Sequence, residues 1–305
     1  MARLVEPQCA GCGVVARGAG IVVCEADQIG YATIEVAAMA GDPRHAAAEG
    51  PAAIRAALHD AGCEFLTHRV SVPRSTGEVI ADSIRVSTQL RDAVRAVVEG
   101  GDVPIVLAGS CDVAPAVLAG IRRPDAGVIW LDAHADFNTP QSSVSGFWPG
   151  MTLAVVVGDC GENVWSALDW HPVDPERVVL IGVRSLSPDE ESLRLERSAL
   201  RVVPWREGLP QHDVETALEA LAQDVDDVYL HLDLDVLDPS VGRGVVDPPV
   251  AGGLSSSQLA ELITEIRERL GLDGATIATY TPANDDGRTL PVAISSIRQL
   301  TGHPS

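Results

Sequence analysis

The stretch that decides the fold is residues 127–139, which read GVIWLDAHADFNT. Its first five residues are apolar or glycine, a pattern typical of a strand covered on both faces of a sheet. Asp132, His134 and Asp136 then follow at a spacing of two, which in extended backbone places all three side chains on one face. Two carboxylates so close would repel each other unless a cation or a proton lay between them. The stretch therefore predicts a core strand that ends in a metal-binding cluster.

A second stretch, residues 228–238, repeats this arrangement and reads VYLHLDLDVLD. His231, Asp233 and Asp235 alternate with leucines, so they too are expected on one face. With the first stretch they supply enough carboxylates to hold two divalent cations roughly 3.5–4 Å apart, and such ligation favours hard ions such as Mn²⁺. His231 either orients one of the metal ligands without binding the metal itself or is a histidine of the core.

A third apolar run, residues 104–108, leads into Gly109, Ser110 and Cys111. A buried free cysteine is usually a small apolar residue of the core. Cys111 differs because the end of its strand is expected to neighbour the end of the strand that carries Asp132.

Short apolar runs alternate with amphipathic stretches along the whole chain. The predicted strands are residues 20–24, 63–70, 104–108, 127–131, 178–182, 200–203, 228–232 and 275–280. The predicted helices are residues 51–61, 82–98, 113–121, 188–195, 214–222, 256–270 and 290–300. This alternation predicts one three-layer α/β domain over residues 20–305, with a parallel sheet covered on both faces, after a flexible extension of residues 1–19. Ligands bind such sheets beyond the carboxyl ends of the strands.

The composition excludes several classes of function. The chain has 305 residues and a formal charge of −21, and all 22 of its basic residues are arginine. Without lysine it has neither a Schiff-base lysine nor a P-loop. The acidic excess argues against nucleic acid and anionic membranes as partners. The N-terminus lacks the apolar segment of a secretory signal, so we expect a cytoplasmic protein in which Cys9 and Cys12 are free thiols.

The two acidic stretches, LDAHADFNT at 131–139 and LDLDVLDP at 232–239, and Gly252-Gly253-Leu254 resemble the arginase–agmatinase (ureohydrolase) family. The resemblance covers nearly the whole chain. It implies a three-layer αβα domain with a central, mainly parallel eight-stranded sheet and two manganese ions. It also implies hydrolysis of a guanidino or amidino carbon–nitrogen bond in a small molecule, and a homo-oligomer, trimeric or hexameric.

Carried over by position, the resemblance implies six metal ligands: Cys111, Asp132, His134, Asp136, Asp233 and Asp235. Asp132 and Asp233 would contact both ions, His134 and Asp235 would complete one metal site, and Asp136 and Cys111 would complete the other. Asp136 and His134 would be the catalytic residues, and Asp136 would pass a proton to the leaving amine.

The sequence also departs from the family pattern. Cys111 stands where most members have histidine, as in the branch that includes N-hydroxyarginine amidinohydrolases, and a softer thiolate makes Zn²⁺, Fe²⁺ or Co²⁺ alternatives to Mn²⁺. Pro149 replaces a histidine often assigned to proton shuttling. Thr279 and Ser187 replace two acids that bind the substrate, so plain arginine and agmatine are not the expected substrates.

The resemblance and the loop at 145–151 together give a set of substrate-binding candidates: Asn138, Ser145, Phe147, Trp148, Ser187 and Thr279. Phe147 and Trp148 would contact the substrate at its entrance or simply pack. Asp247, Asp285 or Asp286 would substitute for a missing acid.

Two other functions stay open on the sequence. If Cys111 is not a ligand, then Asp132, His134 and Asp233 can hold one metal ion, as in the related deacetylases, which cleave amides. Alternatively, the chain is a catalytically quiet homologue that binds a ligand or a partner.

Overall fold

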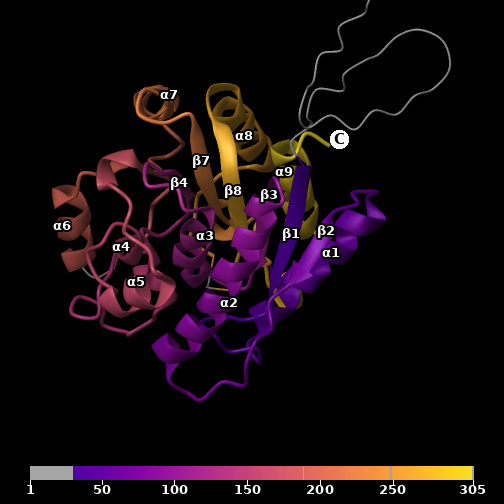
Figure 1. Cartoon of the computed structure of the whole chain (residues 1–305). Coiled ribbons are helices and arrows are strands. Elements are labelled where there is room, and N and C mark those ends of the chain that lie inside the picture. The colour runs from indigo at the N-terminus through magenta and orange to yellow at the C-terminus, as the bar shows by residue number, and fades with distance from the viewer. Residues whose placement is uncertain (1–29, 188, 247–248, 304–305) are drawn as a thin grey trace, which may run out of the picture.

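The computed structural model describes residues 30–187, 189–246 and 249–303. In this part of the chain eight strands form one sheet in the order β2-β1-β3-β8-β7-β4-β5-β6, and every neighbouring pair is parallel (Figure 1). The strands are β1 (Gly30–Val36), β2 (Leu66–Arg69), β3 (Asp102–Ala108), β4 (Gly127–Leu131), β5 (Val178–Ile181), β6 (Arg201–Val203), β7 (Asp227–Asp233) and β8 (Gly271–Ala278). The predicted parallel sheet is confirmed.

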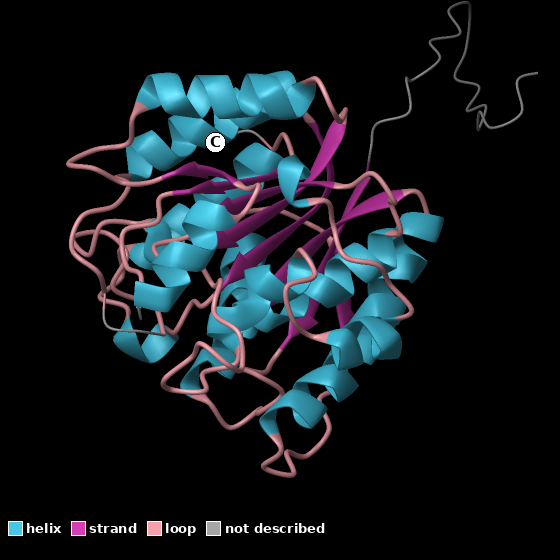
Figure 2. Ribbon diagram, turned by 90° about the vertical axis from the view of Figure 1, so that its left-hand side faces the viewer, coloured by secondary structure: helices cyan, strands magenta, loops and turns pink. Residues whose placement is uncertain are grey.

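Helices cover both faces of this sheet (Figure 2). They are α1 (Gly50–Asp60), α2 (Val79–Glu99), α3 (Ala114–Ile121), α4 (Thr152–Val156), α5 (Glu162–Leu168), α6 (Asp189–Arg197), α7 (Gln211–Ala222), α8 (Ser256–Arg269) and α9 (Thr289–Leu300). Alternate residues of β4 point to opposite sides: Trp130 joins the core under α2 to α5, whereas Leu131 joins the core under α1, α7, α8 and α9. The fold therefore has three layers, αβα, as predicted.

The predicted strand at 20–24 lies outside the described residues. The first described strand, β1, was not predicted, because Thr33 and Glu35 interrupt its apolar pattern. Both side chains are buried. Glu35 is stabilised there by ion pairs with Arg55 and, at 3.5 Å, with Arg69.

The remaining predicted elements are found with shifted ends, and the short helices α4 and α5 are additional. None of the described helices is long and apolar enough to cross a membrane.

Candidate active site

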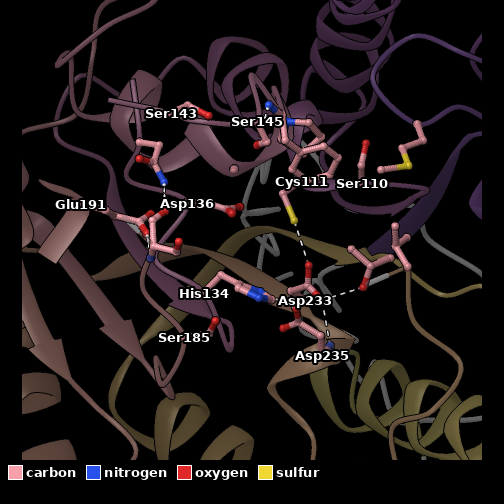
Figure 3. Close-up of a pocket in the computed structure, with 18 of the residues that line it drawn as sticks. Ser110, Cys111, His134, Asp136, Ser143, Ser145, Ser185, Glu191, Asp233 and Asp235 are labelled. Carbon is pink, nitrogen blue, oxygen red and sulfur yellow. Dashed lines mark hydrogen bonds and ion pairs between the residues drawn. The ribbon is translucent and has the colours of Figure 1, made fainter. Parts of the chain in front are cut away.

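The carboxyl ends of four neighbouring strands, β3, β8, β7 and β4, open into a pocket of about 420 Å³. Its floor is made of residues that end or follow these strands: Cys111, Thr279, Asp233, Asp235, His134 and Asp136 (Figure 3). The expectation that the strands of Cys111 and Asp132 are neighbours is wrong, because β8 and β7 lie between β3 and β4. All four strands nevertheless end at one edge, so the side chains still meet.

The possible metal ligands form two overlapping groups. Cys111, Asp132 and Asp136 make one group, and Asp132, His134 and Asp235 make the other; within each group the ligand atoms lie within 4.8 Å of one another. Asp132 belongs to both groups. The third member of the second group is Asp235, not the Asp233 of the single-metal alternative.

The backbone separates these groups in a way that strict alternation does not predict. Asp136 has a φ of 48°, in the left-handed region, which is uncommon for a residue other than glycine. It therefore does not share one face of extended chain with Asp132 and His134. After Asp233, the chain turns into a single 3-10 turn (Leu234–Val236) that contains Asp235. Both corrections concern the residues just beyond a strand, where the alternation of a strand ends.

Hydrogen bonds hold the second group in place. The Trp130 indole Nε1 donates to Oδ2 of Asp132 at 2.9 Å, and the His134 backbone donates to Oδ1 at 2.7 Å. The Asp235 carboxylate accepts from the Ala133 backbone at 2.9 Å and lies 2.8 Å from Nδ1 of His134. These carboxylates are therefore positioned by the protein itself.

Asp233 is held by three donors. The thiol of Cys111 donates to Oδ2 at 3.0 Å, while the Thr279 hydroxyl at 2.6 Å and the Asp235 backbone at 2.8 Å donate to Oδ1. Thr279 has a φ of 70°, a strained conformation for a β-branched residue. Such strain persists where the surroundings fix it, often at functional sites.

Three of the carboxylates are unfavourable as bare charges, whereas for Asp235 burial is outweighed by the hydrogen bond to His134, which lowers its pKa. Burial, followed by repulsion from Asp235, raises the pKa of Asp132 to about 7, and burial with neighbouring carboxylates also raises the pKa values of Asp136 and Asp233. Burial opposes the charge of His134, but its hydrogen bonds to Asp132 and Asp235 raise its pKa to about 12. A divalent cation reverses this balance because it favours the ionised carboxylates. The donor set and its charge thus fit two divalent cations.

His231 lies behind the ligands. It is fully buried, its ring stacks on Trp130 at 3.7 Å between ring centroids, and Nδ1 lies 3.1 Å from the hydroxyl of Tyr229. Burial lowers the pKa of His231 to about 3, so it is neutral. It supports Trp130, which in turn donates to Asp132.

Most of the predicted substrate contacts line the pocket: Asn138, Ser145, Phe147, Ser187 and Thr279. Trp148 does not. It is buried, and its Nε1 donates to the Ser83 hydroxyl at 3.2 Å, so it packs against α2. The hydroxyl of Thr279 already donates to Asp233.

The acids considered as substitutes are placed elsewhere or not described. Asp285 accepts hydrogen bonds from Tyr280 and from the backbone at the start of α9. Asp286 accepts from Arg288 at 3.0 Å. Asp247 lies outside the described residues.

Glu191 is a pocket residue that the sequence reasoning missed. It is buried, and its two carboxylate oxygens accept from the backbone N–H groups of Phe137 at 3.1 Å and Ser187 at 2.9 Å. Burial raises the pKa of Glu191. The acidic run 189–191 at the start of a predicted helix was its only signal, and such a run is usually a solvated helix start.

Comparisons with known proteins place the chain in a family. The sequence model described as "Arginase family" matches residues 32–302. An arginase from Bacillus caldovelox is 35% identical over 222 residues, 70% of this chain and 73% of the relative. An N(omega)-hydroxy-L-arginine amidinohydrolase from Streptomyces lavendulae is 30% identical over 67% of this chain and 71% of its own.

Solved structures give the same result. The crystal structure of an arginase from Bacillus subtilis superposes with a TM-score of 0.77 at 30% identity, covering 90% of this chain and 98% of that one. The chain therefore belongs to the arginase family, whose members are metal-dependent ureohydrolases that cleave carbon–nitrogen bonds.

Proposed function

We propose that the chain hydrolyses a linear carbon–nitrogen bond of an amidino or guanidino-type small molecule, with two divalent cations bound at the pocket floor. The observation that carries this proposal is the pair of ligand groups that share Asp132. A single-metal site would need only one of them.

The six predicted ligands would divide between two ions. Cys111 and Asp136 would complete one site, His134 and Asp235 would complete the other, and Asp132 and Asp233 would serve both. Oxygen ligands predominate, which favours Mn²⁺, whereas the Cys111 thiolate would add affinity for Zn²⁺, Fe²⁺ or Co²⁺.

When bound, the two cations would lower the pKa of a water molecule and so supply a nucleophile at neutral pH. Asp136 faces the pocket and is buried, so its carboxylate can take the proton from the attacking water and give it to the leaving nitrogen. A carbon–oxygen bond forms, the carbon–nitrogen bond breaks, and the leaving group departs as a neutral amine. His134 also lines the pocket, and its hydrogen bond to Asp235 fixes its ring.

Cys111 supports a place in the branch of the family that includes N-hydroxyarginine amidinohydrolases. The resemblance to N-hydroxyarginine amidinohydrolases rests on this residue, and a relative of that name is 30% identical. Ser187 and Thr279, however, offer no carboxylate where the family pattern has acids that bind the substrate, which supports a substrate other than plain arginine or agmatine.

Metal analysis and turnover test the proposal together. Protein loaded with Mn²⁺ should contain two ions per chain and release urea or an amine from at least one guanidino or amidino compound, and chelation should abolish this release. Two ions without turnover on a broad panel of guanidines, hydroxyguanidines and amidines would contradict hydrolysis. One tightly bound Zn²⁺ with amide cleavage would instead favour a deacetylase-like enzyme.

A further inference from the structure

The mouth of the pocket is apolar. Six large hydrophobic side chains are exposed in the described part of the chain, and two of them, Val144 (88% exposed) and Phe147 (38%), line this pocket. We call these two residues the apolar rim. Apolar surface that gathers around a pocket is a sign of ligand binding.

Below the rim, the side of the pocket that carries Ser143 and Ser145 is polar but neutral. Ser143 and Ser145 lie across the pocket from Asp233 and Asp235 (Figure 3). Their hydroxyl oxygens accept from the backbone N–H groups of Gly146 at 3.0 Å and Phe147 at 3.2 Å. The hydroxyl protons remain available to a ligand. Among the described residues, no arginine lines this pocket.

The polar groups that could hold a charged tail are already engaged. Both oxygens of Glu191 accept backbone hydrogen bonds. The Asn138 amide donates to the carbonyl of Ser187 at 3.0 Å, and its oxygen accepts from Ser142 at 3.0 Å. A substrate ammonium group would therefore exchange its hydration for neutral hydroxyl groups and for a carboxylate already shared with two backbone donors, which is costly.

We infer that the substrate carries an uncharged tail that ends in an apolar group, as in an N-alkyl or N-aryl guanidine, with the tail against the apolar rim. This inference rests on the proposed function, because it names the substrate class of the same site. The guanidine carbon would face the floor, and the tail would cross the serine wall.

Four guanidines of matched length test the tail: butylguanidine, agmatine, 4-guanidinobutyrate and arginine. Binding to the Mn²⁺-loaded protein is measured by calorimetry, and turnover is measured separately. Butylguanidine should bind at least about tenfold more tightly than agmatine and arginine, as expected when a polar group is moved into a site that cannot pair with it. Equal or tighter binding of agmatine or arginine would overturn the inference, even with high turnover. Clear binding preference for butylguanidine without turnover of any guanidine would support the inference and contradict the proposed hydrolysis.

Serine substitutions in the apolar rim, compared with a control valine outside it, test whether the rim binds the tail. Val144→Ser and Phe147→Ser should each reduce the preference for butylguanidine over methylguanidine by about tenfold. The control, Val79→Ser, makes the same substitution as Val144→Ser at a valine that is 48% exposed at the start of α2. It should leave that preference unchanged. If the rim variants keep the preference of the unmodified protein, the apolar rim does not bind the tail.

Discussion

The thiol of Cys111 lies 3.0 Å from Oδ2 of Asp233, and this contact joins the ends of β3 and β7 across the intervening strand β8. Burial, together with the neighbouring carboxylates, raises the pKa of the Cys111 thiol well above its usual value. A thiol in this position stays protonated unless a cation takes the place of its proton. The contact therefore indicates where a metal ion would enter.

Replacing this thiol should weaken one of the two metal sites. We expect Cys111→Ser to lower the affinity for one ion by at least about tenfold, because changes around a metal cost this much even when the ligands stay. Cys111→His should retain two ions and favour Mn²⁺ over Zn²⁺ more than the unmodified protein does. Isothermal titration with each metal measures both. Cys63→Ser, at a buried cysteine of the opposite core, is the control, and unchanged binding in Cys111→Ser would remove Cys111 from the ligand set.

The hydroxyl of Thr279 should matter through Asp233. Thr279→Ser keeps the donor that lies 2.6 Å from Oδ1 of Asp233, whereas Thr279→Ala removes it. We expect Thr279→Ala to reduce kcat/KM by roughly 10–100-fold, since it frees a proposed ligand, and Thr279→Ser to stay within a few-fold of the parent. Steady-state kinetics with metal saturation separates the two. Equal losses in both variants would indicate that the strained backbone, not the hydroxyl, is what the site needs.

Trp130 should hold Asp132 in place. In Trp130→Phe the hydrogen bond of 2.9 Å to Asp132 is lost, so we expect metal affinity to fall by roughly 10–100-fold. Trp165→Phe is matched, because its Nε1 donates at 2.9 Å to the backbone carbonyl of Val155. It should cost about 1 kcal/mol of stability and leave metal affinity unchanged. The same metal affinity in both variants would count against a role for Trp130 at the site.

Acid should destabilise the protein partly through Asp82. Hydrogen bonds from Thr76 and Ser75, at 2.7 and 2.8 Å, lower the pKa of Asp82 from 3.8 to about 2. A lowered folded-state pKa contributes stability that is present above 3.8 and is lost as pH falls through about 2. The free energy of unfolding of Asp82→Asn should thus lie below that of the parent at neutral pH, and the gap should narrow in acid. A gap that is constant with pH would contradict this assignment.

Metal removal should lower the melting temperature. The buried carboxylates of the pocket repel one another, and cations that bind only the folded chain stabilise it by ~2.7 kcal/mol at a hundredfold excess over Kd. For a chain of this size the shift is on the order of 4 °C for each cation. Thermal unfolding with a chelator and with added Mn²⁺ measures it. A melting temperature that does not respond to Mn²⁺ would indicate that protonation of the carboxyl groups, and not a bound cation, relieves their repulsion.

The central strands were predictable because their apolar runs are buried on both faces, as in Val128 and Ile129 of β4. The first described strand, β1, was not, because its buried Glu35 is compensated by Arg55 and Arg69, which are distant in sequence. In the sequence alone, a charged residue within an apolar run is typical of a loop, because the ion pairs that allow its burial are not visible.

The residues of the candidate site were predictable as a set, and the two groups that share Asp132 match the grouping that the resemblance implied, but the backbone that carries these residues was not predictable. Asp136 adopts a left-handed backbone conformation and Asp235 lies in a 3-10 turn, so neither continues the alternation of its strand. The positions of Trp148, which lies outside the pocket, and Glu191, which lines it, could not be predicted from sequence spacing either. The direction of a side chain in a loop depends on contacts such as that of Trp148 with Ser83, and no spacing rule predicts those contacts.

A structure of the Mn²⁺-loaded protein, with anomalous scattering, tests the two-cation site most directly. We predict two anomalous peaks at the pocket floor, both in contact with Asp132, with Sγ of Cys111 bound to one of them. A single peak held by Asp132, His134 and Asp235 would contradict the account, as would two peaks from which Cys111 is excluded.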